Sequence, residues 1–190
     1  MKKRARVKKS RVMFRGRVFR VRCDEVVEPR LPGEPARQAV VREIVEHHGS
    51  VVVLPVLADG CVLLVRQFRY AAGEFLWELV AGHIEPGSPR RRRGERPLEA
   101  ARRELQEKTG YTARRFELLG SFYPSPGFVT ERMHLYRATG LRPGEARPEA
   151  DESFQVRAFS RRQLKRMLRH GLLRDAKTLV GVLLELHKPA

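Results

Sequence analysis

One segment, residues 82–111, constrains this chain more than any other. It opens with the string GHIEPG at 82–87, runs through consecutive arginines, and closes with RELQEKTGY at 103–111. Glycine and proline in the first string predict a loop. Pro97 suits a first helical turn, and Gly110 is typical of the position just after a helix. The segment therefore predicts a glycine loop that leads into a helix over 97–109.

Two glutamates of this helix lie on one side of it. Glu104 and Glu107 are three residues apart, which places them about 60° apart around the helix axis. Mg²⁺ prefers oxygen ligands and keeps several waters, so a few carboxylates suffice to hold it. Water attacks a diphosphate slowly unless cations neutralise its charge. This turn therefore predicts a site that holds Mg²⁺ against a diphosphate.

The whole segment resembles the Nudix box, with the family pattern G-x5-E-x7-R-E-U-x-E-E-x-G-U, where U is a bulky apolar residue. The chain departs from the pattern twice. Seven extra residues, 88–94, separate the glycine loop from Glu95, and Lys108 stands where the pattern has its last glutamate. The resemblance implies an α/β fold, a Nudix-type α/β/α sandwich with a mixed β-sheet, preceded by an N-terminal β-hairpin or strand region.

The resemblance also implies the metal ligands. Glu104 corresponds to the first ligand glutamate, Glu107 lies beside the position of the last one, and the backbone carbonyl of Ala81 (or of Gly82) adds another oxygen. Mg²⁺ is the expected cofactor, with Mn²⁺ as an alternative. Lys108 repels a cation while it is protonated. Three hypotheses stay open: Glu107 replaces the lost ligand with lowered activity, Lys108 contacts phosphate with fewer metals bound, or hydrolysis is largely lost.

An acidic string, EADE at 149–152, resembles the loop that precedes the last strand in this family. Glu152 matches a metal-ligand position, so Glu104, Glu107 and Glu152 form the expected catalytic set. The family often has a water-activating carboxylate where this chain has Ala150, so Glu149 or Asp151 would have to replace it. In the family, the pair equivalent to Glu95 and Arg103 mainly ties the loop to the helix.

Strings outside the box resemble the ADP-ribose pyrophosphatase branch: LVRQFRY at 64–70, FLWELVAG at 75–82 and SPGF at 125–128. Val80 replaces the usual proline of the second string. The resemblance implies that four residues bind substrate, each with a structural alternative. Arg69 would contact phosphate or ribose and Glu78 would lie near the adenine or ribose, or both are surface ion-pair partners. Phe128 would line the pocket or the core, and Glu131 would meet the terminal ribose or cap a strand.

The periodicity of the chain predicts one domain-sized α/β unit with short strands. Strands are expected over 12–27 (as a strand or hairpin), 39–45, 50–57, 61–70, 75–80, 116–123, 131–139 and 155–159, and helices over 97–109, 160–171 and 175–187. Leu98, Ala101 and Leu105 are expected to form the inner face of the first helix. The predicted division is a basic flexible tail at 1–10, N-terminal strands with a dimerisation role at 11–48, and the Nudix domain at 49–190.

The composition limits which binding partners and which cellular compartment are expected for this chain. The net charge is +17, and arginine supplies 31 of the 39 basic residues. Such charge attracts polyanionic metabolites or nucleic acid, although a general arginine bias explains it equally. Two cysteines without metal-ligand spacing favour a reducing cytoplasm. The absence of an apolar run of about 20 residues argues against a membrane span.

The function implied by the resemblance is Mg²⁺-dependent hydrolysis of the diphosphate linkage of ADP-ribose or a related nucleoside diphosphate sugar. The products would be AMP and a sugar phosphate, and a homodimer is expected. Two alternatives stay open. Lys108 and Ala150 favour a catalytically weakened module that binds nucleotides or regulates a partner, and the arginines at 90–93 favour an RNA-linked pyrophosphohydrolase.

Overall fold

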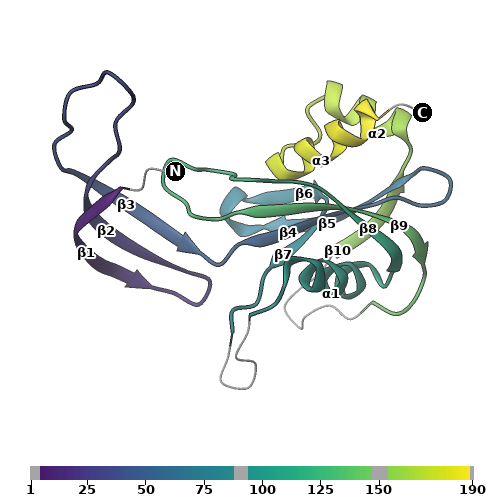
Figure 1. Ribbon diagram of the computed structural model, residues 1–190. Helices are drawn as coiled ribbons and strands as arrows, with labels where there is room; N and C mark the ends of the chain where they lie inside the picture. Colours follow the sequence, from purple (N-terminus) through teal and green to yellow (C-terminus); the bar gives the residue numbers. More distant parts are fainter. Residues whose placement is uncertain (1–4, 88–93, 147–153, 189–190) are drawn as a thin grey trace. The chain divides into compact units, whose positions relative to one another are not determined.

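The computed structural model describes residues 5–87, 94–146 and 154–188. The chain forms two compact units (Figure 1). The first comprises residues 1–49 and 123–131, and the second comprises residues 50–122 and 132–190. The N-terminal unit thus recruits a segment, 123–131, that the sequence analysis assigns to the Nudix domain.

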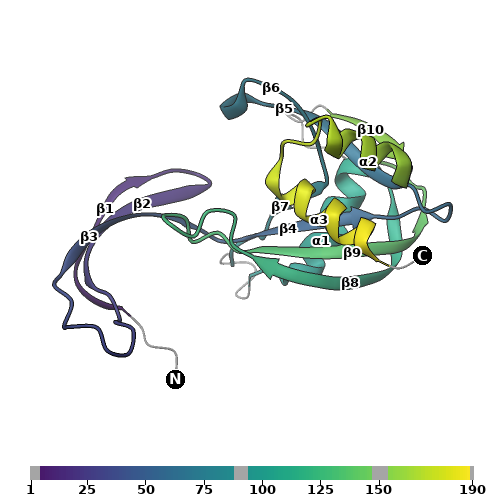
Figure 2. The same ribbon diagram turned by 90° about the horizontal axis from the view of Figure 1, so that it is seen from above.

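The first unit is a three-stranded antiparallel meander of β1 (Arg6–Arg15), β2 (Phe19–Val27) and β3 (Val40–His47), seen clearly in Figure 2. The predicted hairpin is confirmed, and its turn is closed by the Gly16 N–H, which donates to the Phe19 carbonyl at 2.9 Å. Residues 6–10, assigned to the tail from sequence, instead pair with β2. The segment 123–131 joins β3, where the Val45 N–H donates to the Phe128 carbonyl at 2.8 Å.

The second unit contains two sheets and three helices. Its elements are β4 (Ser50–Pro55), β5 (Val62–Arg69), a 3₁₀ turn at Tyr70–Ala72, β6 (Glu74–Glu78), β7 (Val80–His83), α1 (Pro97–Thr109), β8 (Thr112–Phe122), β9 (Met133–Arg142), β10 (Phe154–Phe159), α2 (Arg161–Arg169) and α3 (Ala176–His187). The strand orders are β10-β5-β6 and β7-β4-β9-β8. Strands β4 and β9 are parallel and the other neighbours antiparallel, so the predicted mixed sheet is confirmed.

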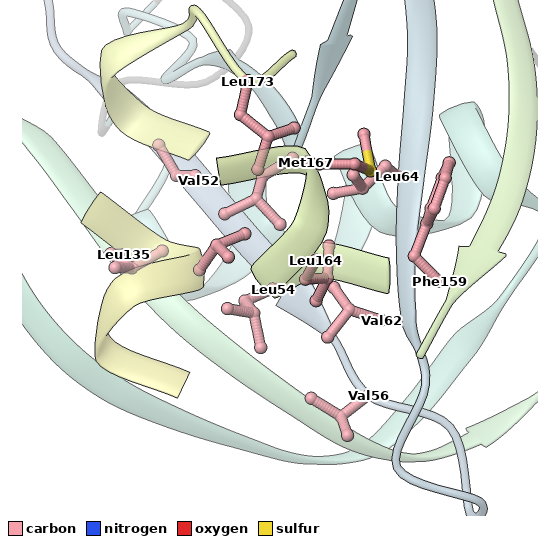
Figure 3. Packing of buried hydrophobic residues seen from close by; sticks show 12 residues of the cluster. Val52, Leu54, Val56, Val62, Leu64, Leu135, Phe159, Leu164, Met167 and Leu173 are labelled. Atoms are coloured by element: carbon pink, nitrogen blue, oxygen red, sulfur yellow. The ribbon is translucent and has the colours of Figure 1, made fainter. Parts of the chain in front are cut away.

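Helices cover both sides of these sheets. On one side Val52 and Leu54 of β4 pack with residues of α2 and α3 (Figure 3). On the other side the alternate residues Val51 and Val53 pack against α1. Successive side chains of a strand point to opposite faces, so a strand that is buried throughout separates two cores. Figure 1 shows α1 on one side and α2 with α3 on the other, which confirms the α/β/α sandwich.

Two local predictions are wrong. Leu98 is 38% exposed, and the inner face of α1 is formed by Ala100, Ala101 and Leu105. The single strand predicted over 75–80 is divided at Leu79, because β6 pairs with β5 whereas β7 pairs with β4. At the division the Leu79 N–H donates to Thr178 Oγ1 at 2.8 Å, which satisfies a buried backbone donor between the two sheets. Among the described helices, none has the length and apolarity that crossing a membrane requires.

Candidate active site

Local sequence defines both ends of α1. The backbone N–H of Arg96 donates to Glu99 Oε2 at 3.0 Å, and Pro97 occupies the first turn, where a missing N–H costs no helical hydrogen bond. The helix ends at Gly110, whose φ of 73° lies in the left-handed region that glycine adopts without strain. The bounds predicted from sequence, 97–109, are confirmed.

Arg103 ties the helix to the glycine loop. Its Nε and Nη2 donate to the two carboxylate oxygens of Glu95 at 3.0 and 2.9 Å, and Nη2 also donates to the His83 carbonyl at 3.0 Å. The Glu85 N–H donates to Glu95 Oε2 at 3.2 Å, and the Glu95 N–H donates to the Glu85 carbonyl at 3.0 Å. These two hydrogen bonds join the chain on either side of the extra residues 88–94. The predicted role of the Glu95–Arg103 pair is therefore confirmed. The arginines at 90–93 lie outside the described residues.

We expect Arg103→Lys to lower the free energy of unfolding by about 2–3 kcal/mol, because a lysine cannot replace the two-pronged contact with the buried Glu95 carboxylate. Chemical denaturation followed by circular dichroism measures this change. The matched control is Arg102→Lys, since Arg102 lies over the Phe116 ring at 4.9 Å and has no comparable network. Equal losses in the two variants would contradict a special role for Arg103.

Two carboxylates of α1 converge on one atom. Arg103 Nη1 donates to Glu104 Oε1 at 2.7 Å and to Glu107 Oε2 at 3.0 Å. Glu104 is buried, whereas the Glu107 side chain is about one-third exposed. The two glutamates singled out from sequence are thus brought together, one deep and one near solvent.

Glu104 lies directly against the glycine loop. A Cβ atom placed on Gly82 would stand 1.9 Å from the carboxyl carbon of Glu104, far inside any permitted contact. Only a glycine leaves room for the carboxylate at this point of β7, next to Ala81. Burial raises the pKa of Glu104, and the Arg103 guanidinium and the Lys108 ammonium oppose that rise.

Lys108 is buried beside Glu104. Its Nζ lies 4.0 Å from Glu104 Oε2 and 5.4 Å from the centre of the Phe154 ring, and its side chain is only 7% exposed. Lys108 and Glu104, four residues apart, therefore share one side of the helix. An ammonium group is therefore built into the site beside the deeper carboxylate.

The oxygen ligands near Gly82 and α1 supply part of a site for a hard divalent cation such as Mg²⁺. Glu104 and Glu107 supply oxygen ligands close together, and Mg²⁺ needs few protein ligands because it retains waters. Within the described ranges, no group of three or more His, Cys, Asp or Glu side chains is placed to hold a metal ion. Glu152, and with it Glu149, Ala150 and Asp151, lies outside the described residues.

Arg69 and Glu78 pair with each other. Arg69 Nε and Nη2 donate to the two Glu78 oxygens, each at 2.7 Å, and Lys177 Nζ donates to Glu78 Oε2 at 2.7 Å. Burial would raise the pKa of Glu78, but the hydrogen bonds of Arg69 and the charge of Lys177 lower it overall. Because Glu78 is only 1% exposed, it is a buried partner, which differs from the surface ion pair considered from sequence.

Sequence reasoning missed Lys177. This lysine also donates to Asp175, the residue that caps α3, at 2.7 Å. The string RDAKTL at 174–179 points to this region, but nothing in it shows that Lys177 meets a glutamate 99 residues away. Phe128 and Glu131 belong to the first unit, where Phe128 is 54% exposed and Glu131 Oε1 lies 3.7 Å from His47 Nδ1.

Comparison with known proteins decides the family. The model of the NUDIX domain matches residues 46–179, which is more than half of the chain. The chain belongs to the Nudix family. This Nudix hydrolase is 34% identical to the ADP-ribose pyrophosphatase of Bacillus subtilis strain 168, over 90% of its own length and 86% of that protein. It is 33% identical to the methanol dehydrogenase activator of Bacillus methanolicus, over 92% and 88% of the two chains.

A solved structure confirms the fold. The Nudix hydrolase superimposes on the crystal structure of an ADP compounds hydrolase with a TM-score of 0.75, covering 96% of this chain and 92% of that one, at 19% identity. The family and fold expected from the box are therefore both confirmed. Nudix hydrolases generally use a divalent metal, and the paired carboxylates of α1 agree with that requirement.

Proposed function

We propose that this Nudix hydrolase cleaves the diphosphate linkage of ADP-ribose or a related nucleoside diphosphate sugar. With ADP-ribose, water would attack one phosphorus, the bridging P–O bond would break, and AMP and ribose 5-phosphate would leave. The observation that carries the proposal is the convergence of Glu104 and Glu107 on Arg103 Nη1, with the Glu104 carboxylate against Gly82. The relative named ADP-ribose pyrophosphatase supports the choice of substrate class.

The proposed catalytic set is Glu104, Glu107 and Glu152, which would hold Mg²⁺ or Mn²⁺ together with the Ala81 carbonyl. When bound, the ion supplies charge neutralisation at the diphosphate and lowers the pKa of a coordinated water. Arg103 orients the two carboxylates of α1 through a single nitrogen, so it acts as a positioning residue. Gly82 leaves the space that Glu104 requires.

Substrate contacts are proposed for Arg69, Glu78, Phe128 and Glu131. Arg69 would meet phosphate or ribose, and Glu78, which accepts two hydrogen bonds from the Arg69 guanidinium, would lie near the adenine or the ribose. Phe128 offers an exposed ring to a base, and Glu131 offers a carboxylate to a ribose hydroxyl. An Arg69→Ala variant that bound ADP-ribose as tightly as the wild-type protein would contradict this assignment.

The direct test is a substrate screen with the full-length protein and Mg²⁺ or Mn²⁺. The substrates are ADP-ribose, other nucleotide sugars, dinucleoside polyphosphates and capped RNA, and the products are separated by chromatography. Release of AMP and ribose 5-phosphate from ADP-ribose, lost on adding EDTA, is the expected result. Preferential decapping of RNA would instead favour the RNA-linked alternative.

A second candidate function is a regulatory, nucleotide-binding module. Lys108 beside Glu104 favours it, because the ammonium opposes binding of a cation there. A relative named methanol dehydrogenase activator is consistent with a regulatory role. ADP-ribose binding measured by calorimetry without any turnover at high enzyme concentration would support this candidate over the hydrolase.

We expect Lys108→Glu to tighten Mg²⁺ binding by about tenfold and to raise turnover, because the substitution replaces a repelling charge with an oxygen ligand. Calorimetry with Mg²⁺ alone and the rate of AMP release measure the two effects. Lys165→Glu makes the same charge change at an exposed position of α2 and serves as the control. Unchanged or weaker Mg²⁺ binding in Lys108→Glu would show that Lys108 does not stand in for a ligand.

A homodimer through the first unit is also proposed. Its strands, together with the turn between β1 and β2, expose apolar side chains, namely Val7, Val12, Met13, Phe14, Val18, Phe19 and Val41. Exposed apolar patches mark interaction surfaces. Phe14→Asp combined with Val12→Asp is then expected to yield monomers in analytical ultracentrifugation. The two free cysteines, Cys23 and Cys61, are consistent with the proposed cytoplasmic location.

A further inference from the structure

A cavity lies in the second unit, away from the Nudix box. Its volume is about 580 Å³, within the range of small-molecule sites. Strands β5, β6 and β10 and helix α2 build it. Its lining includes four arginines and three aromatic rings: Arg66, Arg157, Arg166, Arg174, Phe75, Trp77 and Phe159.

This cavity opens on the opposite side of the sheets from α1. Phe159 and Met167, which line it, belong to the core beneath α2 and α3 (Figure 3). Ala101 and Leu105 of α1 belong to the other core. The buried strand β5 separates the two cores, because its residues alternate between them. The cavity is therefore distinct from the Glu104–Glu107 site.

Most of the positive charge in the cavity has no ion-pair partner among the described residues. Arg66, Arg157 and Arg166 lie in no salt bridge there, whereas the fourth arginine, Arg174, pairs with Glu74. Elsewhere in the same unit, the half-buried Arg103 and Arg137 are paired with carboxylates. Three guanidinium groups thus line one cavity without a carboxylate partner among the residues that the structure describes.

The rings set the shape of the ligand. Arg66 lies 5.3 Å from the centre of the Phe75 ring, and Arg157 lies 5.2 Å from that of Phe159. Trp77 meets Phe159 edge to face at 4.9 Å. Phe75 remains 56% exposed, so its ring is accessible to a planar ligand. Guanidinium groups bind phosphate through paired hydrogen bonds and stack on planar rings.

We propose that this cavity is a second binding site, for a nucleoside phosphate. The aromatic walls take the base and the three arginines take the phosphate, and orthophosphate alone would fill little of the volume. The choice of ligand class, though not the existence of the site, rests on the proposed function, whose product AMP belongs to that class. The site thereby gives the protein a means to sense its product.

The test uses Trp77, the only tryptophan of the chain. The full-length protein is titrated with AMP in EDTA, and tryptophan fluorescence is recorded. A saturable change is expected, with orthophosphate and adenosine each binding at least about tenfold more weakly than AMP, because each makes half of the contacts. No saturable change in the wild-type protein would overturn the proposal.

Two matched double variants test whether the AMP-dependent change in Trp77 fluorescence arises from binding in this cavity. Arg157→Ala combined with Arg166→Ala is expected to weaken AMP binding by about tenfold or more, since two charge-assisted contacts are lost. Arg162→Ala combined with Arg169→Ala removes the same charge from exposed positions of α2 outside the cavity and is expected to have little effect. Calorimetry repeats the comparison without relying on Trp77. Equal weakening in both double variants would overturn the proposal.

One further variant separates this site from the proposed active site. Glu104→Gln is expected to keep the Trp77 response to AMP even where hydrolysis is lost. Loss of that response in Glu104→Gln would place AMP at α1 and overturn the second site. Failure of the wild-type protein to hydrolyse nucleotide sugars, with AMP binding intact, would overturn the proposed function alone. A single-stranded RNA oligomer that binds this cavity more tightly than AMP would overturn the choice of a mononucleotide.

Discussion

Replacing Glu104 with glutamine is expected to lower the turnover of ADP-ribose by about a hundredfold or more. The amide keeps the size of the side chain but removes the charge of the deeper carboxylate beside Gly82. Electrostatic stabilisation in a site shielded from water is usually the largest catalytic contribution, and removing one such group costs about 10²–10³ in rate. The rate of AMP release and the affinity for Mg²⁺, measured by calorimetry, report the two consequences.

The control for this change is Glu117→Gln, which removes the same charge from an exposed position on β8. We expect its turnover to match that of the wild-type protein. The melting temperatures of both variants should lie close to the wild-type value, so that loss of activity is not loss of fold. Wild-type rates in Glu104→Gln would remove Glu104 from the catalytic set.

Gly82→Ala is expected to reduce turnover to a similar extent while leaving the fold intact. The new methyl group would lie 1.9 Å from the Glu104 carboxyl carbon, so the carboxylate has to move away. The clash involves the far end of a flexible side chain, which can rotate aside at little cost in stability. Because catalytic geometry tolerates only small displacements, a shift of this size costs activity.

Gly120→Ala provides the comparison, because a Cβ atom at Gly120 meets nothing within 4 Å and φ there is not positive. Steady-state kinetics and thermal unfolding of the two variants separate the expectations. A Gly82→Ala protein with full activity would show that the close contact between Gly82 and Glu104 is not required. A large loss of stability would show that the backbone, rather than the carboxylate, yields to the methyl group.

The sequence predicted those parts of the fold that short-range interactions govern. Helix α1 was predicted to the residue, because Pro97 and Gly110 act on their own immediate backbone. The Glu95–Arg103 contact followed from the resemblance to the box and is present in full. Leu98 failed as an inner-face residue, because it lies in the first helical turn and the buried stripe passes through Ala100 instead.

Other features depend on which elements pack together. The division of the strand at Leu79 arises because two sheets meet there and Thr178 of α3 satisfies the backbone between them. Lys177 reaches Glu78 for the same reason, since α3 packs beside β6. No local pattern encodes contacts of this kind, because their partners are distant along the chain.

By itself, the sequence determined the family, the glycine loop and the helix that carries Glu104 and Glu107, since these rest on the residues of one continuous segment, 82–111. Tertiary structure decided that Lys108 is enclosed against the Phe154 ring, that Lys177 reaches Glu78, and that arginines from three separate elements line an aromatic cavity. The physical reason is that packing of sheets and helices, rather than spacing along the chain, brings distant side chains to within a few ångströms.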